Sequence, residues 1–361
     1  MNPAPQIDLL QLLALTRVPG IGSTRLRSLI DRFGSTAAVA RASPRELCQV
    51  RGIDQKLAYR IKTRPDPGFA ERELRLVDDS GAKLLHFWDR EFPRRLRTIY
   101  DPPVLLYIKG RFEQKDERAL ALVGTRFPSS YGQIMAEKFA YDLARCGVTS
   151  ISGLARGIDT LVHRSSLRAG GRTIAVLGSA LDRVYPPENR ELGDQVIELG
   201  ALLSEFPMGT SPEPCNFPRR NRLIAGLCAG ILVVEAGRRS GALITADFAL
   251  ESGRDVFAIP GNLNNPKSAG GNLLLQQGAT LVIRTEDILD ELGWSAVEPL
   301  AQPALGSEEQ TILSVLDNRP RHIDAIARSC QMSIGEALTL LLGLELKNRV
   351  RQIPGKHFIR L

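Results

Sequence analysis

The residues best suited to holding an anion cluster in one segment, NFPRRNRLIAG, at residues 216–226. Arg219, Arg220 and Arg222 stand near the start of a predicted helix, after an aromatic residue and a proline. Arginine grips phosphate oxygens through its planar fork, and an aromatic ring such as Phe217 can stack on an unpaired base. The alternative is structural, with Phe217 packed inward and one arginine in an ion pair. The sequence alone leaves both interpretations open.

Glycine-bearing turns follow six predicted strands. They are GTRFPSSYG (124–132), SGLARGID (152–159), GSALDRVYPPEN (178–189), SEFPMGT (204–210), EAGRRSGALIT (235–245) and PGNLNNPKSAGGN (260–272). Glycine lets a backbone approach an anion closely, and the neighbouring amides donate hydrogen bonds to it. One such turn would say little, because strand-to-helix turns favour glycine anyway. Six turns in one sheet, several with arginine, indicate an extended anionic ligand.

The elements that must position these turns form a regular series. Runs that are mostly apolar throughout occur at 119–124, 148–153, 173–179, 201–206, 230–236, 255–261 and 280–283, with helix-length segments between them. Two further strand-like runs, 83–88 and 103–110, flank a short basic helix. Strands without alternation are buried on both faces, as in a parallel α/β sheet. We therefore predict an α/β fold with an extended Rossmann-like, mostly parallel sheet over 83–293, whose ligands bind beyond the carboxyl ends of the strands.

Two smaller domains are predicted beside this core. Residues 1–67 read as a small all-α domain in which the turns VPGIG (18–22) and VRGID (50–54) each precede a helix, and TRPDPG (63–68) reads as a linker. Such turns are similar to helix-hairpin-helix modules, whose amides can hold a DNA phosphate, although a glycine-capped helical hairpin explains them equally well. After a second predicted linker at 295–307, residues 306–361 show three helical stretches and a strand pair, which indicates a winged helix. A helical cap or dimerisation module is the alternative, because this segment is electrically neutral.

Several functional classes are disfavoured. The chain has no GxGxxG, P-loop, GxSxG or HExxH motif, and its five cysteines include no CxxC pair. We expect no cofactor, no metal and no catalytic activity. The longest apolar run, 223–236, is too short to span a bilayer, and the first residues lack the basic region of a signal peptide. A cytoplasmic protein without a membrane partner is therefore expected.

The charge is distributed unevenly. The formal net charge is +7, and residues 1–70 carry 11 Lys and Arg against 5 Asp and Glu. This surplus suits a polyanion partner for the N-terminal segment, although solubility alone could account for it.

Taken together, the motifs resemble those of the DprA/Smf (DNA-processing protein A) family. The resemblance covers residues 83–285 and is carried by the six turns above, by FPRRN, by VVEAGRRSGALITADFA and by GGNLLLQQGA. It implies a homodimer that binds single-stranded DNA without sequence preference and helps to load RecA recombinase, as in natural transformation. The family's GSR turn is matched by Gly124, Thr125 and Arg126, where threonine keeps the hydroxyl of serine. Its SGxAxGID and FPxRN elements are matched at 152–159 and 217–221.

The resulting set of candidate DNA-binding residues is drawn from the strand ends and the arginine-rich helix. It comprises Gly124, Thr125, Arg126, Ser152, Gly153, Arg156, Gly157, Gly178, Phe217, Arg219, Arg220, Asn221, Arg222, Ser240, Lys267 and Asn272.

Two other functions remain open from the sequence. The fold and Glu235 also resemble nucleoside-monophosphate phosphoribohydrolases, but the PGGxGT turn of those enzymes is missing. A duplex-DNA regulator acting through the winged helix is the second, and the neutral C-terminal segment counts against it.

A self-association surface is predicted in TEDILDELGW, residues 285–294. With Thr285 as N-cap, Ile288, Leu289 and Leu292 form one apolar stripe on a helix that ends the sheet. We expect this stripe to lie at a two-fold interface, the alternative being that all three residues pack on the last strand.

Overall fold

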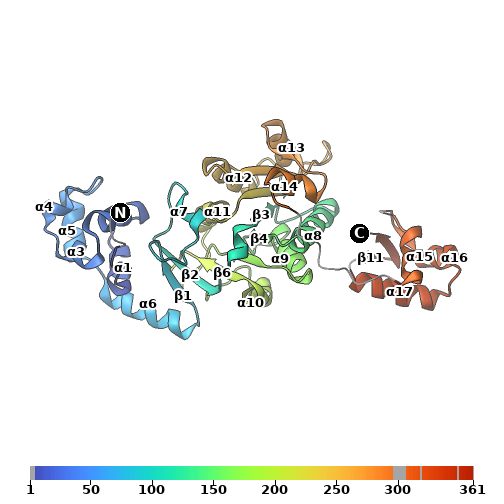
Figure 1. Cartoon of the computed structure of the whole chain (residues 1–361), viewed down its shortest axis with the longest axis horizontal. Helices are drawn as coiled ribbons and strands as arrows, with labels where there is room; N and C mark the ends of the chain where they lie inside the picture. Colours follow the sequence, from blue (N-terminus) through green and yellow to red (C-terminus); the bar gives the residue numbers. More distant parts are fainter. Residues whose placement is uncertain (1–4, 296–305, 318, 348, 361) are drawn as a thin grey trace. The chain divides into compact units, whose positions relative to one another are not determined.

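The computed structural model describes residues 5–295, 306–317, 319–347 and 349–360. Residues 296–305, most of the second predicted linker, lie outside the described residues. The chain forms two compact units, Met1–Ala296 and Val297–Leu361 (Figure 1).

The first unit is built on a nine-stranded sheet, which confirms the predicted fold class. Its strands are β1 (Lys83–His86), β2 (Leu105–Gly110), β3 (Ala119–Gly124), β4 (Thr149–Ser152), β5 (Thr173–Val176), β6 (Ala201–Ser204), β7 (Gly230–Glu235), β8 (Asp255–Ala258) and β9 (Thr280–Leu281). Their spatial order is β1-β2-β6-β5-β4-β3-β7-β8-β9. All neighbours from β6 to β9 are parallel, and β1 and β2 add an antiparallel edge.

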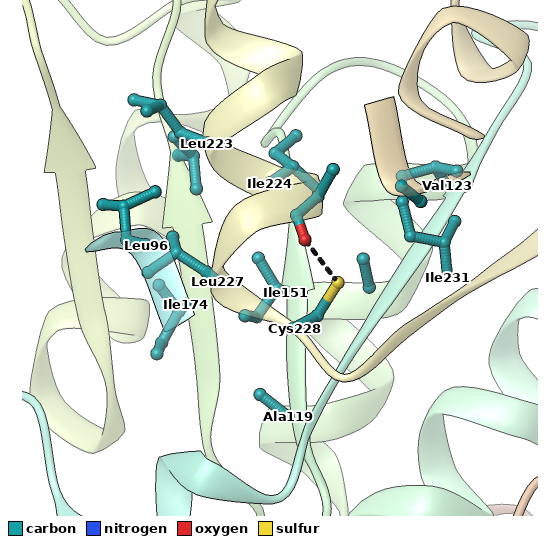
Figure 2. Packing of buried hydrophobic residues seen from close by; sticks show 14 of the residues in the cluster. Leu96, Ala119, Val123, Ile151, Ile174, Leu223, Ile224, Leu227, Cys228 and Ile231 are labelled. Carbon is teal, nitrogen blue, oxygen red and sulfur yellow. Dashed lines mark hydrogen bonds between the residues drawn. The ribbon is translucent and has the colours of Figure 1, made fainter. Parts of the chain in front are cut away.

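Helices cover both faces of this sheet. They are α7 (Arg94–Arg97), α8 (Ser130–Arg145), α9 (Ile158–Arg168), α10 (Arg190–Leu199), α11 (Asn216–Leu227), α12 (Gly241–Glu251), α13 (Ala269–Gln276) and α14 (Thr285–Glu291), with short 3-10 turns η1 (Gln114–Glu117) and η2 (Pro187–Asn189). Alternate residues of β3 belong to opposite layers: Ala121 packs with α11 and α12, whereas Leu122 packs with α8 and α9. Figure 2 shows the first of these layers, in which Leu223 and Leu227 of α11 lie among apolar strand residues.

Cys228 ends that helix inside the core. Its thiol donates to the carbonyl of Ala225 over 3.3 Å (Figure 2), and burial raises the pKa of Cys228 to about 12. The thiol of Cys228 is therefore a packing group.

The chain reverses direction across the sheet at β3. Strands β4, β5 and β6 follow it on one side, and the chain then returns to place β7 on the other side. The carboxyl ends of β3 and β7 therefore diverge into helices on opposite faces and leave a crevice between them, which is where open α/β sheets bind ligands.

The N-terminal helices share a core with the edge of the sheet. They are α1 (Leu9–Thr16), α2 (Ser23–Phe33), α3 (Thr36–Arg41), α4 (Pro44–Leu47), α5 (Gln55–Thr63) and α6 (Pro67–Asp79). Leu105 of β2 packs in the same apolar cluster as these helices. The predicted linker at 63–68 is a short connection, in which residues 64–66 join α5 to α6 and Asp66 caps α6 by accepting a hydrogen bond from the Phe69 amide.

Both predicted hairpin turns need glycine. Gly20 and Gly52 have φ values of 95° and 83°, the left-handed region that favours glycine. Arg25 of α2 donates to the Gly20 carbonyl over 2.7 Å, and Arg60 of α5 donates to the Pro19 carbonyl over 3.2 Å. The helices that follow the two turns thus both hold the first turn in place.

The second unit confirms the predicted winged helix. Its elements are α15 (Ser307–Val315), β10 (Arg321–His322), α16 (Ile323–Ser329), α17 (Ile334–Leu346), β11 (Val350–Ile353) and β12 (His357–Arg360), and its strands lie in the order β10-β12-β11. The third helix, α17, contains no lysine or arginine.

The predicted self-association stripe is wrong for two of its three residues. Ile288 and Leu289 are buried inside the first unit, in the layer that also contains Val282 and helices α8 and α9, and Leu292 packs against the same cluster. Helix α14 begins at Thr285, with Arg284 as its N-cap residue. Residues already covered by their own chain offer no face to a second copy.

Among the described residues, no helix combines the length and apolar character that crossing a membrane requires.

Candidate functional site

The turn after β3 is the best-fixed part of the crevice. The Thr125 amide donates to the Glu235 carbonyl of β7 over 2.8 Å, and Ser129 donates from its amide and its hydroxyl to the Glu235 carboxylate. A Cβ on Gly124 would approach the Glu235 carbonyl to 2.9 Å, so only glycine fits there. Buried Glu235 thereby fixes the turn that carries Arg126.

A second turn, after β4, closes against the first. Asp159 accepts hydrogen bonds from the amides of Gly153 and Ala155, at 3.1 and 3.3 Å. Gly157 has a φ of 78°, and a Cβ there would approach the Thr125 carbonyl to 2.5 Å. Burial raises the pKa of Asp159, against the opposing field of Arg220. The turn brings two strand ends together and buries its own carboxylate.

Arg220 lies at the floor of the crevice rather than on its surface. Its side chain donates to the carbonyls of Gly153, at 2.7 Å, and Val176, and to the Asn221 side chain at 3.2 Å. Gly153 leaves room for the guanidinium, because a Cβ on residue 153 would clash with it. Burial lowers the pKa of Arg220 to about 10, so the group stays charged at neutral pH. Arg220 therefore contributes positive potential while its own donors bind the backbone.

Phe217 forms one wall and is half-buried. The guanidinium of Arg126 lies 5.3 Å from its ring centre, and the ring of Tyr185 lies 5.9 Å away. A Cβ on Gly178 would approach the Phe217 ring to 2.9 Å, so this glycine makes room for the aromatic side chain. The ring is thus already in contact with a cation and a second ring.

Together these turns enclose a cavity of about 720 Å³. The described residues that line it include four cations, Arg126, Arg220, Arg239 and Lys267, against one carboxylate, Asp159. Its aromatic and proline lining consists of Phe127, Tyr185, Pro212, Pro214, Phe217 and Pro218. Ser240, the N-cap residue of α12, also lines the cavity, with its hydroxyl accepting from the Ala242 amide at 3.3 Å.

The structure brings most, but not all, of the predicted residues to this cavity. Gly124, Thr125, Arg126, Phe217, Arg220, Asn221, Ser240 and Lys267 line it directly. Gly153, Gly157 and Gly178 are the close-approach positions around it. Arg156 lies beside it, paired with Glu188 and 6.0 Å from the Tyr185 ring.

Four predicted residues have other roles. Arg219 and Arg222 line a different cavity, next to the N-terminal helices, where Arg222 binds Glu205 and the Asp101 carbonyl. The Asn272 side chain bonds the backbone of Gly261 at 3.0 and 3.1 Å, and the Ser152 hydroxyl donates to the Leu122 carbonyl at 2.7 Å. The structure does not bring these four residues to the cavity of Arg126, because helix geometry directs Arg219 and Arg222 away from Arg220 and local backbone groups engage the other two.

Sequence reasoning missed Phe127, Tyr185 and Arg239. Arg239 could have been found, since it follows the end of β7 within the quoted turn EAGRRSG. The aromatic residues gave no such signal, because only the folded turns show which rings face the cavity.

The open, mostly parallel sheet, with a cationic, aromatic-walled pocket at the point where its strand order reverses, defines a Rossmann-like fold. The chain belongs to the family of DNA recombination-mediator protein A, whose family model matches residues 83–293. The DprA winged helix domain matches residues 296–356, and a SAM-like helix-hairpin-helix tandem matches residues 12–64.

Relatives and solved structures agree with this assignment. Protein Smf of Escherichia coli is 34% identical over 98% of this chain and 95% of its own length. The crystal structure of DNA processing protein A from Streptococcus pneumoniae, 34% identical, superposes with a TM-score of 0.70 over 79% of this chain and 98% of its own. The Helicobacter pylori protein, whose structure describes a single-stranded DNA binding mode, is 28% identical, with a TM-score of 0.53 over 58% of this chain and 95% of its own.

Proposed function

We propose that this chain binds single-stranded DNA, without sequence preference, in the pocket at the carboxyl ends of β3 and β7. The observation that carries the proposal is the combination of four cations with an aromatic and proline-rich lining in one cavity. Cations neutralise phosphates irrespective of sequence, and rings accept any unpaired base. The single-stranded DNA binding mode described for the Helicobacter pylori relative supports the same ligand here.

The geometry argues against the two alternatives. Hydrolysis of a glycosidic bond needs a carboxylate at the reacting atoms, but Asp159, the one carboxylate among the described lining residues, is buried and bonded to its own turn. Glu235 is likewise buried and engaged by Ser129. A duplex-reading winged helix needs cations on its third helix, and α17 has none.

The resemblance to the DprA/Smf family supports a finer proposal. According to this proposal, the protein is a cytoplasmic homodimer that passes the bound strand to RecA recombinase, as in natural transformation. It carries out no chemistry itself. Because Ile288 and Leu289 are buried, the dimer interface must use other residues. Formation of RecA filaments on a strand already bound by the protein, compared with the strand alone, tests the transfer.

The direct test of DNA binding is Arg126→Ala. Each phosphate neutralised on a single strand contributes roughly −0.7 to the slope of log K against log salt, so the variant should bind oligo-dT more weakly and flatten that slope by roughly 0.7. Fluorescence anisotropy across a salt series measures both quantities. Arg111→Ala, whose side chain is 79% exposed at the other end of the sheet, is the matched control. Unchanged affinity and slope in folded Arg126→Ala, or tighter binding to an equally long duplex, would contradict the proposal.

A further inference from the structure

Phe127 is an exposed aromatic side chain at the pocket. It lines the cavity together with Arg126 and Lys267, and 72% of its surface is accessible to solvent. An apolar ring is normally buried when it can be, so an exposed ring beside a cationic pocket needs a physical reason.

The backbone, rather than disorder, holds Phe127 outward. Its amide donates to the Thr125 hydroxyl over 3.2 Å. Two residues later Ser129 is bound through its amide and hydroxyl to the buried carboxylate of Glu235. The turn is therefore fixed on both sides of Phe127, and the ring projects from a rigid base.

Phe127 and Phe217 differ in how much of each ring remains available. Phe217 already lies near the guanidinium groups of Arg126 and Arg220 and near the Tyr185 ring. Among the described residues, no aromatic ring or cationic side chain stacks on Phe127. Its faces are open to a ligand, whereas those of Phe217 are partly covered.

We infer that Phe127 is a stacking platform for an unpaired base of a strand whose phosphates bind the cations of this pocket. The inference rests on the proposed function and adds a second, base-directed contact to it. Stacking tolerates any base, because every base has a π-face. Bases inside a duplex are already stacked on each other, so the platform favours a single strand.

The test compares Phe127→Ala with Phe127→Trp. The strands are oligo-dT and an abasic strand that has the same phosphates without bases. Phe127→Ala should weaken oligo-dT binding by about 5- to 150-fold, the range for one stacked base, and leave the abasic strand nearly unaffected. The salt slope should stay unchanged, because no phosphate contact is lost. Phe127→Trp should retain affinity, and its fluorescence should be quenched by oligo-dT but not by the abasic strand.

Tyr100→Ala is the matched control, because Tyr100 is 95% exposed and does not line the pocket. Wild-type affinity of Phe127→Ala for oligo-dT would overturn the inference, as would equal losses on both strands. A change in oligomeric mass with DNA affinity intact would also overturn it, since the ring would then contact protein. If wild-type protein binds neither strand, the proposed function itself fails. If Arg126→Ala behaves as proposed while Phe127→Ala has no effect, only this inference fails.

Discussion

The two ends of the sheet each carry a cavity lined by several arginines, yet the two cavities differ in charge. At the carboxyl end, the described lining residues include four cations and one carboxylate. At the opposite end, a cavity of about 470 Å³ is lined by five cations and four carboxylates. Arginine is abundant at both ends, but the surplus of positive charge is three at the first end and only one at the second.

A buried arginine at each end shows the cause of the difference. Arg172, at the amino end of β5, donates to both carboxylate oxygens of Asp116 at 2.9 Å. It also donates to the Glu113 carboxylate and to the backbone carbonyls of Leu199 and Arg111. Arg220 donates to backbone carbonyls and an amide instead. Neutral acceptors satisfy the donors of Arg220, and the nearby Asp159 carboxylate accepts from the amides of its own turn, whereas carboxylates directly accept the hydrogen bonds of Arg172. A binding arginine is therefore distinguished by its acceptors, not by its burial.

The largest expected effect is on stability, from Arg172→Met. Removing this cation leaves the buried carboxylate of Asp116 without its partner. Such a loss typically lowers the free energy of unfolding by about 3–5 kcal/mol. Urea unfolding followed by tryptophan fluorescence should show this loss, while the folded variant binds oligo-dT like the wild type. Arg111→Ala removes an exposed pair with Glu113 and should cost less than about 1 kcal/mol. Weakened DNA binding by folded Arg172→Met would break the comparison.

The second largest expected effect is on the pH dependence of stability and arises from His163. This side chain is buried, and the positive charge of Arg220 acts on it. His163 Nδ1 lies 2.7 Å from the Thr173 hydroxyl, which itself donates to the Ser150 carbonyl, so Nδ1 carries the proton. Burial, with Arg220 as the smaller cause, lowers the pKa of His163 to about 3.

The lowered pKa of His163 fixes the direction in which stability changes with pH. Below about pH 6.5 the unfolded chain takes up a proton that the folded chain refuses until about pH 3, so stability falls on acidification. The loss due to His163 should reach about 2 kcal/mol at pH 5 relative to neutral pH. Urea unfolding at pH 7.5 and 5.0 measures it, and His163→Asn should reduce the dependence by that amount. An identical pH dependence in the variant would show that other groups cause it.

Much of the fold could be predicted from the sequence because its signals are local. The apolar runs gave the strands, and the turns after them gave the position of the crevice. What failed depended on tertiary contacts. The stripe of Ile288 and Leu289 looks the same whether it faces the core or a second copy. TRPDPG looks like a linker, and only the folded structure shows that the Asp66 amide in it donates to the Ala14 carbonyl of α1.

The candidate site was predictable to the same extent. Glycine and arginine at strand ends located Gly124 to Arg126 and Arg220 correctly around one cavity. Arg222, two residues beyond Arg220, could not be separated from it, because only the folded structure shows Glu205 beside it. Nor could the sequence show that Phe127 is open to solvent while Phe217 is partly covered.

The smallest expected effect is that of substituting Ser240. The substitution tests whether the Ser240 hydroxyl binds the ligand or only caps its own helix. Its hydroxyl caps α12 by accepting from the Ala242 amide, yet it also lines the cationic cavity. Ser240→Ala should cost about 1 kcal/mol of stability, whereas Ser240→Gly should cost only a few tenths, since glycine is a tolerated N-cap. If the hydroxyl serves only the helix, both variants, measured by urea unfolding and anisotropy, keep wild-type DNA affinity. If it also donates to a phosphate, both lose affinity to a similar degree although only alanine destabilises the fold. The glycine variant is decisive, because it removes the hydroxyl while sparing the helix, and a loss of binding there would place Ser240 with Arg126 rather than with Arg172.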